Sequence, residues 1–347
     1  MRSDRWVSGL ERYSRQILLS EIGKDGQEKL LSSAIAVIGC GALGTVIANS
    51  LVRAGVGRVK IVDRDYIELN NLQRQVLFDE EDIAKGLPKA IAAAEKLRKV
   101  NSQVEIEPIM ADVNPDNVEG IIADVDLVLD GTDNFETRFL INDACVKHDI
   151  PWICGAVIGT WGMTMSIIPH QTLCFRCFLS KMPAPGTTPT CDTVGVLGSA
   201  VNIVASLEVT EAIKLLIGKK EELHGKLFFV DVWAGTWEHV EVTKAPSPCP
   251  TCDLGHFEFL EAKRGSHITT LCGREAVQVS VREGARVSFL QLASRLKPVG
   301  EVTFNEYMLR FKVSPYELTV FPDGRTIVKG TTDEALARTL HAKYIGA

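Results

Sequence analysis

The sequence predicts an α/β protein, with a Rossmann-like, doubly wound mixed sheet followed by a small α+β domain. An apolar run, a glycine-rich turn and a helical run follow one another within residues 34–56, and strand-like and helical segments then alternate to about residue 169. This order is typical of a parallel sheet with crossover helices. After a Pro-rich stretch at 245–255, closely spaced strand-like runs predominate. We therefore expect two domains, 1–255 and 256–347.

The first domain begins with an amphipathic helical stretch at 10–31, which we expect to be broken at 23–26 by glycines. Short runs rich in β-branched residues then predict buried strands. These strands are 34–39, 58–65, 104–110, 126–133 and 150–157. The helices predicted between them are 45–56, 88–101, 114–123 and 134–149.

The next segments predict the end of the first domain and the content of the second. An antiparallel strand at 162–169 precedes a Pro- and Thr-rich loop at 180–192, a long apolar helix at 193–218 and a strand pair at 226–243. In the second domain, Asp323-Gly324 predicts a hairpin turn. The remaining predictions there are strands within 276–281, 301–313, 316–321 and 326–330, and helices at 288–297 and 332–345.

Composition narrows the class of protein. The net charge of −6 and the low aromatic content of 7% argue against a nucleic-acid partner. The uncharged stretch 30–52 has the length of a membrane span, but its glycines and polar residues indicate a strand, a turn and a helix. Because the N-terminus also lacks an apolar signal-peptide core, we expect a cytoplasmic protein without a membrane partner.

The glycine turn predicts a nucleotide site. Gly39, Gly41 and Gly44 lie between a predicted strand and a predicted helix, where glycine permits a tight turn and lets backbone approach a phosphate. Asp63 ends the next strand, the position from which a carboxylate accepts hydrogen bonds from ribose hydroxyls. These residues indicate an adenine nucleotide, but they do not separate NAD from ATP.

Cations and strand-end carboxylates favour ATP. Arg74 and Lys89 follow Asp63 along the chain, and Asp130 and Asp133 end a later strand. Arg12 and Arg15 lie near the N-terminus. Such groups, together with Mg²⁺, suit a triphosphate, because they stabilise the negative charge that develops on a pyrophosphate leaving group.

Several motifs in order give the sequence a family resemblance. They include ERYSRQILL at 11–19, the glycine turn, NNLQRQ at 70–75, DLVLDGTDN at 126–134 and TCDTVGV at 190–196. The sequence resembles the HesA/MoeB/ThiF adenylyltransferases, bacterial relatives of the ubiquitin-activating E1 enzymes. The resemblance spans about residues 10–253, or roughly 70% of the chain. It therefore covers the first expected domain and leaves out the C-terminal one.

The resemblance implies a homodimeric enzyme that uses ATP and Mg²⁺ to adenylate the C-terminal Gly-Gly carboxylate of a small ubiquitin-fold sulfur-carrier protein. A sulfur donor, a cysteine desulfurase or a rhodanese, is a further implied partner. Thiamin and molybdopterin synthesis are among the pathways such enzymes serve. The implied roles are ribose binding by Asp63, nucleotide approach at Gly41, phosphate contacts by Asn70, Arg74 and Lys89, magnesium binding by Asp133, and an arginine finger from the partner subunit at Arg15. For the phosphate contact implied for Lys89, Lys85 is a weaker candidate.

Two alternatives of other classes stay open. The glycine turn alone would also suit an NAD(P)-dependent oxidoreductase. A zinc module with a C-terminal domain would also suit a non-catalytic adaptor, although an adaptor needs no cluster of Arg15, Arg74, Lys89 and Asp133.

The cysteine spacing predicts a metal site. Cys174 and Cys177 form one C-x-x-C pair, and Cys249 and Cys252 form another. Four thiolates make a closed, tetrahedral Zn²⁺ site that serves stability rather than chemistry. Because the pairs are far apart in sequence, the fold must bring them together. The alternative is four unligated thiols or a redox pair.

The other cysteines have different expected roles. Cys191 ends the Pro/Thr loop just before a predicted helix, whose N-terminus would lower the pKa of a thiol. The resemblance implies that this thiol can form a covalent adduct with the activated carrier, although a dispensable loop thiol is the alternative. Cys40, Cys145 and Cys154 are predicted packing residues, and Cys272 has no assigned role. The second domain is hypothesised to help dock the carrier or the sulfur donor.

Overall fold

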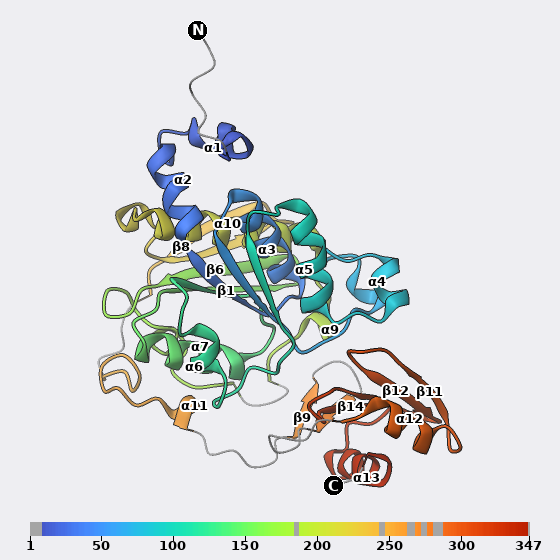
Figure 1. Cartoon of the computed structure of the whole chain (residues 1–347). Coiled ribbons are helices and arrows are strands. Elements are labelled where there is room, and N and C mark those ends of the chain that lie inside the picture. Colours follow the sequence, from blue (N-terminus) through green and yellow to red (C-terminus); the bar gives the residue numbers. More distant parts are fainter. Residues whose placement is uncertain are drawn as a thin grey trace. The chain divides into compact units, whose positions relative to one another are not determined.

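The chain folds into two compact units (Figure 1). The first consists of Met1–Thr188 and Val196–Ala262, and the second of Pro189–Gly195 and Lys263–Ala347. The computed structural model describes residues 9–183, 187–242, 247–261, 268–271, 276–279 and 287–345. Cys272 lies outside these described residues.

An eight-stranded sheet forms the centre of the first unit, in the order β3-β2-β1-β4-β5-β6-β7-β8. The first five of these strands pair in parallel, and the last three continue the sheet in antiparallel pairing. The predicted doubly wound mixed sheet is therefore confirmed. Its strands are β1 (Ala34–Ile38), β2 (Arg58–Val62), β3 (Glu105–Ile109), β4 (Leu127–Asp130), β5 (Trp152–Ile158), β6 (Trp161–Ile167), β7 (Leu227–Asp231) and β8 (Thr236–Val240).

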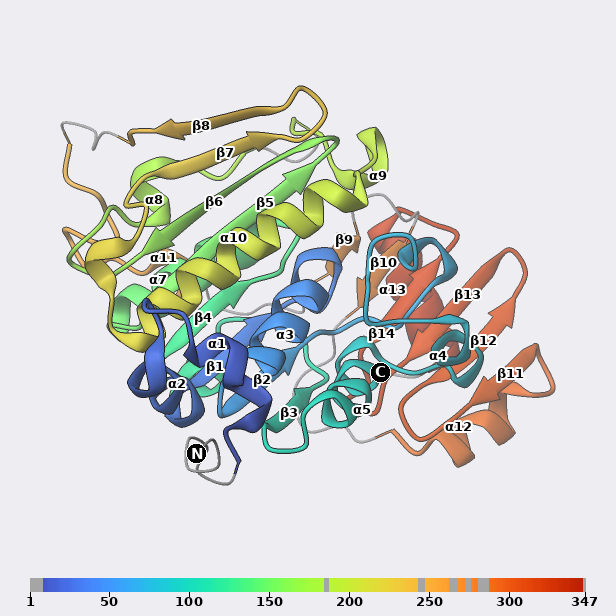
Figure 2. The same ribbon diagram turned by 90° about the horizontal axis from the view of Figure 1, so that it is seen from above.

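Helices cover both faces of this sheet (Figures 1 and 2). On one face, α10 packs against α3, β5 and β6, and α5 packs against β2 and β3. On the other face, α7 packs against α6, α8 and α11. The larger helices are α2 (Gly23–Ser32), α3 (Ala42–Ala54), α4 (Glu80–Lys85), α5 (Lys89–Val100), α7 (Phe135–Lys147) and α10 (Gly198–Ile217). The shorter ones are η1 (Glu11–Tyr13), α1 (Ser14–Ile17), η2 (Leu69–Asn71), α6 (Val118–Ile122), α8 (Phe175–Phe178), α9 (Cys191–Val194), η3 (Lys220–Glu222) and α11 (Glu258–Glu261).

Two predicted helix bounds are wrong. The break predicted at 23–26 instead lies between Ile17 and Gly23, where α2 begins. Gly26 is helical, and a Cβ there would lie 3.6 Å from the Ile217 side chain, so this glycine permits close packing rather than a break. The long helix begins at Gly198 rather than 193, because Gly195, with φ of +79°, ends the separate turn α9.

The strand order reverses between β1 and β4, which places the ends of these two strands side by side. Gly39 follows β1 with φ of +89°, and a Cβ there would lie 2.7 Å from the carbonyl carbon of Gly131, which follows β4. A Cβ on Gly44 in α3 would lie 1.8 Å from the carbonyl oxygen of Gly39. The three glycines therefore let two strand ends and one helix meet at the point where doubly wound sheets bind ligands.

The second unit is built on a six-stranded antiparallel sheet, β11-β12-β13-β14-β10-β9. Helices α12 and α13 pack against it over a core that includes Phe311, Leu318 and Val328. The strands are β9 (Ile268–Leu271), β10 (Ala276–Val279), β11 (Glu301–Phe304), β12 (Leu309–Val313), β13 (Tyr316–Val320) and β14 (Thr326–Lys329), and the helices are α12 (Phe289–Leu296) and α13 (Glu334–Tyr344).

The turns of this sheet follow from short polar residues. The run predicted as one strand at 301–313 is two strands, because the Asn305 side chain accepts hydrogen bonds from the backbone of Tyr307 and Met308 and turns the chain. The hairpin predicted at Asp323-Gly324 joins β13 to β14, with Gly324 at φ of +84°. Strand β9 and helix α11 were not predicted.

We predict that Gly44→Ala destabilises the protein by about 3 kcal/mol or more, because the added methyl group would meet backbone that cannot move aside. Thermal and urea unfolding measure the change. The matched control is Gly120→Ala in α6, where a Cβ meets nothing within 4 Å. That control should gain about 0.5–1 kcal/mol from helix propensity. Equal stability of the two variants would contradict this account of the glycine contact.

Candidate active site

The start of α3 is the part of the candidate site that we expect to receive a phosphate group. Gly41 is the N-cap of this helix, and no side chain caps it. The first N–H groups of a helix have no intrahelical partner, so they point outward with the positive end of the helix dipole. A Cβ on Gly41 would approach only the Gln75 side chain and the Gly131 carbonyl, both at 3.9 Å. The backbone at Gly41 is thus open enough to receive an anion.

Asp63 lies beside this turn at the end of β2. Its carboxylate accepts hydrogen bonds from the backbone N–H groups of Cys40 and Asp65, both at 2.7 Å. Burial raises the pKa of Asp63, whereas the nearby Lys89 ammonium lowers it. Each carboxylate oxygen keeps a second lone pair, with which it can accept a hydrogen bond from a ribose hydroxyl.

Lys89 is brought to the same place by α5, of which it is the first residue. Its side chain is 4% exposed, and its Nζ lies 3.2 Å from Asp65 Oδ2. Lys85, by contrast, is exposed on α4 and pairs with Glu81 at 2.7 Å. The fold therefore brings Lys89 close to Asp63, as a phosphate-binding cation would require, and places Lys85 at the surface.

The segment after β2 carries the next candidates. Asn70 is exposed in η2, and its backbone carbonyl accepts a hydrogen bond from Arg74 Nη1 at 2.7 Å. The sequence analysis did not single out Gln75, although it ends the NNLQRQ motif. Its side chain is buried beside Gly41, and none of the described residues hydrogen-bonds its Oε1 atom. Gln75 thus lies next to the glycine turn, in the same segment as Arg74.

The two strand-end carboxylates have different environments. Asp130 is fully buried and accepts a hydrogen bond from Arg138 Nε at 2.7 Å and two from Thr132. Asp133 is exposed in the loop before α7. A hard oxygen donor that is exposed beside the glycine turn suits Mg²⁺. Asp130, with both oxygens engaged, does not.

Arg15 lies away from these residues of its own chain. It is exposed on α1, and the next residue, Gln16, donates a hydrogen bond to the carbonyl of Ala54 at the far end of α3. The glycine turn is at the start of α3, and a helix of this length spans about 20 Å. Within one chain, the fold does not bring Arg15 to the glycine turn.

The four cysteines of the two C-x-x-C pairs meet on the other side of the sheet. Their Sγ atoms all lie within 4.8 Å of one another. The Sγ distances are 3.8 Å for Cys174–Cys177, 3.7 Å for Cys174–Cys249 and 3.5 Å for Cys177–Cys252. Thiolates that bind zinc tetrahedrally at 2.3 Å lie about 3.8 Å apart. The cluster therefore fits a closed Zn²⁺ site with no open position.

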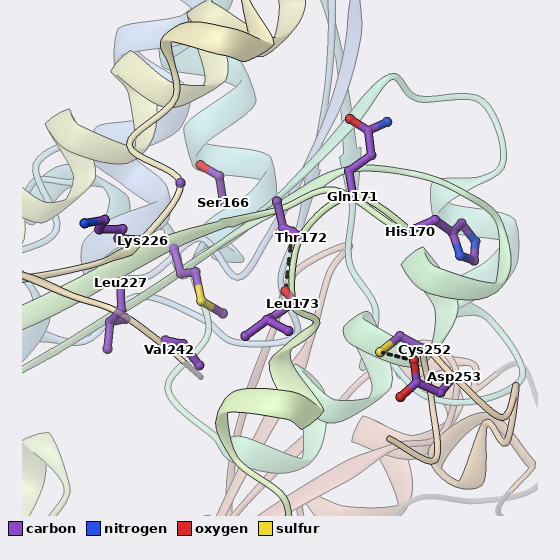
Figure 3. A pocket seen from close by; sticks show the side chains of 12 residues that line it. Ser166, His170, Gln171, Thr172, Leu173, Lys226, Leu227, Val242, Cys252 and Asp253 are labelled. Atoms are coloured by element: carbon purple, nitrogen blue, oxygen red, sulfur yellow. Dashed lines mark hydrogen bonds between the residues drawn. The ribbon is translucent and has the colours of Figure 1, made fainter. Parts of the chain in front are cut away.

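A separate hollow of about 560 Å³ adjoins this cluster (Figure 3). It is lined by the end of β6 and the start of β7, with Met165, Thr172, Lys226 and Cys252 among its residues. Because β6 runs antiparallel to β5, this is the edge of the sheet opposite the glycine turn. Among the described residues, none of those predicted to bind the nucleotide lines it.

Comparison with known proteins identifies the family. The protein-family model described as "ThiF family" matches residues 13–251 of the sequence. The chain belongs to the ThiF family. The predicted resemblance to HesA/MoeB/ThiF adenylyltransferases is thereby confirmed.

Several similar proteins have related names. The sulfur carrier protein ThiS adenylyltransferase of Bacillus subtilis is 41% identical over 337 residues, covering 96% of this chain and 99% of that protein. The SAMP-activating enzyme E1 of Haloferax volcanii is 41% identical over 252 residues, covering 73% and 92%. The structure of E. coli MccB with ATP matches with a TM-score of 0.61 at 22% identity, covering 72% of this chain and 75% of that chain. This last likeness concerns the fold.

The other predicted features have mixed outcomes. Cys40, Cys145 and Cys154 are buried, as predicted for packing residues. Cys191 begins α9, a single turn capped by Thr190, so the helix dipole that was expected to activate its thiol is small. No helix within the described residues combines the length and the apolar character needed to span a membrane.

Glu208 is a buried group that the sequence analysis missed. It lies in α10 with its carboxyl group against β5, where a Cβ on Gly155 would lie 2.0 Å from Glu208 Oε1. None of the described residues hydrogen-bonds either oxygen. Burial raises the pKa of Glu208 well above its ordinary value, the Asp130 carboxylate adds to the rise, and Arg138 opposes it. The surroundings therefore favour the protonated, uncharged form of this side chain.

This raised pKa predicts a pH dependence of stability. Above pH 4.5 the unfolded chain loses the Glu208 proton while the folded protein keeps it, so stability falls as pH rises towards the folded pKa. Glu208→Gln removes this titration. Between pH 5 and pH 7, the stability of the wild type relative to the variant should fall by up to about 1.4 kcal/mol per pH unit, measured by urea unfolding. Parallel pH curves would show that Glu208 is ionised in the fold.

Proposed function

We propose that the protein is an ATP-dependent adenylyltransferase that activates the C-terminal carboxylate of a small ubiquitin-fold sulfur-carrier protein and releases pyrophosphate. One observation carries the proposal: the turn between β1 and α3 is surrounded by Asp63, the buried Lys89 and the exposed Asp133. A hydride carrier needs the first of these groups, whereas a triphosphate with its metal uses all of them. The names of the relatives agree with this proposal.

The reaction follows from these positions. The carrier carboxylate attacks the α-phosphorus of ATP, the bond to the bridging oxygen of the β-phosphate breaks, and the electron pair leaves on pyrophosphate. Asp63 holds the ribose, and the α3 N-terminus with Asn70, Arg74 and Lys89 holds the phosphates and the charge that develops on them. A bound Mg²⁺ ion, held by Asp133, would neutralise phosphate charge.

A homodimer completes the site in this proposal. Arg15 lies near the far end of α3 from its own glycine turn. In a two-fold dimer it would reach the partner's nucleotide as an arginine finger. The neighbouring Leu18 and Leu19 are 64% and 52% exposed, which supports an additional protein contact at this end of the unit.

A protein substrate is supported by the sheet edge. Strand β8 is exposed along its whole length; Trp237 within it is 54% exposed, and Trp233 just before it is 80% exposed. An exposed edge strand with aromatic neighbours suits docking of another β-sheet protein. We assign the carrier to this edge.

The later sulfur step is a further part of the proposal. The acyl adenylate would be attacked by a sulfur donor, a cysteine desulfurase or a rhodanese, or by the Cys191 thiol with release of AMP. The C-terminal domain, taken as 256–347 beside an adenylation domain at 1–255, would help dock the carrier or the donor. Thiamin or molybdopterin synthesis is the proposed type of pathway.

We also assign Zn²⁺ to the cluster of Cys174, Cys177, Cys249 and Cys252. The ion would link the loop after β6, which leads to the first C-x-x-C pair, to the last segment of the first unit, which carries the second pair. Because four thiolates leave no open coordination position, its role is stability.

Carrier-dependent exchange of pyrophosphate into ATP tests the activity. We expect Asp133→Ala and Lys89→Ala each to lower the exchange rate at least about a hundredfold, since each removes charge stabilisation of the leaving group. Glu136→Ala removes another exposed carboxylate, in the first turn of α7, and should leave the rate within about twofold.

Ligand preference provides a second readout of the same experiment. ATP with Mg²⁺ at about 100 Kd should stabilise the wild type by roughly 2.7 kcal/mol in thermal unfolding. Stabilisation by NAD instead of ATP would favour the oxidoreductase alternative. Exchange that survives unchanged in Asp133→Ala would remove the magnesium assignment.

Zinc removal should affect stability before chemistry. We expect Cys252→Ala to lower the zinc content, measured by atomic absorption, and to destabilise the first unit by about 3 kcal/mol or more. Cys145→Ala is the matched control, since this buried thiol lies outside the cluster and should cost about 1 kcal/mol with the zinc content unchanged. A full metal content in Cys252→Ala would contradict the four-thiolate site.

A further inference from the structure

The Arg138 side chain hydrogen-bonds to three segments near Asp133, the candidate magnesium ligand. It lies in the first turns of α7, with its side chain 7% exposed. Its Nε donates to Asp130 Oδ2 at 2.7 Å, and its Nη2 donates to the carbonyl oxygens of Thr132 at 2.7 Å and of Gly155 at 2.9 Å. One guanidinium thus holds the end of β4, the loop after it and the middle of β5.

The loop held in this way is the one that carries Asp133. Its first residue, Gly131, donates its N–H to the carbonyl of Ile38 at 2.7 Å and packs against Gly39. Its second residue, Thr132, is fixed through its carbonyl by Arg138 and through its N–H and hydroxyl by Asp130. Asp133 follows directly and is exposed. The backbone that presents its carboxylate is therefore fixed on the preceding residue.

The buried charges agree with this arrangement. Asp130 forms a buried ion pair with the guanidinium, and burial raises the pKa of the nearby Glu208 carboxyl group. Both oxygens of Asp130 are occupied, so this acid balances Arg138 and orients it instead of binding a cation. Removing Arg138 would leave Asp130 buried without its counter-ion and the Thr132 carbonyl without its donor.

We propose that Arg138 is a positioning residue that fixes the Thr132 carbonyl and thereby aims the Asp133 carboxylate at the nucleotide-bound magnesium ion. The proposal rests on the proposed function, because the role of Asp133 as magnesium ligand belongs to it. Arg138 itself contacts neither metal nor nucleotide in this proposal. Its effect should therefore appear in the metal-dependent part of nucleotide binding.

Calorimetric titration of ATP into the full-length protein, without carrier, measures that part directly. The affinity is determined once with Mg²⁺ and once with EDTA, and their ratio is compared between variants. Arg138→Gln should lower this ratio about tenfold, with the EDTA affinity within about twofold of wild type. Arg138→Lys keeps the charge and should recover part of the ratio. Arg58→Gln is the control: it breaks a partly exposed ion pair with Asp124 at the start of β2, and should leave the ratio unchanged.

A double-mutant cycle separates positioning from general destabilisation. Asp133→Ala should lower the ratio by itself, and adding Arg138→Gln should then lower it little further, because both changes act on one ligand. Additive losses, or equal losses of affinity with Mg²⁺ and with EDTA, would overturn the positioning role. If Arg138→Gln does not fold, Asp130→Asn replaces it, because this change weakens the hydrogen bonds that hold Arg138 and Thr132. Asp130→Asn should also lower the ratio. An unchanged ratio in that variant would overturn the proposal.

The outcomes also separate this proposal from the proposed function. If wild type binds ATP with a clear Mg²⁺ dependence that Asp133→Ala removes, the nucleotide site stands. An unaltered ratio in Arg138→Gln then rejects only the positioning role. A wild type that fails to bind ATP, or binds it without any metal dependence, rejects the proposed function and with it this proposal.

Discussion

The close approach of backbone at the strand switch point is the constraint on which the rest of the first unit depends. Because Gly39, Gly44 and Gly131 have no side chains, the backbone at the ends of two parallel strands and at the start of α3 can come into direct contact. Because no Cβ separates them, the helix N-terminus, the Asp63 carboxylate and the loop of Asp133 lie at the same edge of the sheet. These ends meet because β1 and β4 pair in parallel, at the point of reversed strand order where doubly wound sheets bind ligands.

A set of buried charged groups lies next to the loop that carries Asp133. Arg138, Asp130 and Glu208 lie among apolar residues where an unpaired charge is costly. The structure meets that cost with one ion pair, two backbone carbonyl acceptors and a carboxyl group whose pKa is raised by burial. Such a set of groups has few alternative arrangements, which makes it a rigid base for the exposed groups above it.

Much of the fold could be predicted because its elements carry local signals. Buried strands read as apolar runs, and the glycine turn has a specific order, so the eight-stranded sheet follows from the sequence almost element by element. The long helix was misplaced at its start because Gly195 ends a turn through its backbone conformation, which composition does not reveal. Gly26 was misread because its role is packing against Ile217, nearly the whole unit away in sequence.

The site was predictable to the extent that its residues have a chemical type and a motif. The partners that orient them were not: Gln75, Arg138 and Glu208 act through contacts made by folding. The Pro189–Gly195 segment illustrates the same point for the whole chain, because it is grouped with a sheet that begins more than seventy residues later. The second unit is thus discontinuous in sequence, and the backbone passes three times between the units. A protein ended after Ala262 would lose more than its last domain: the Cys191 segment would be left without the residues it folds with.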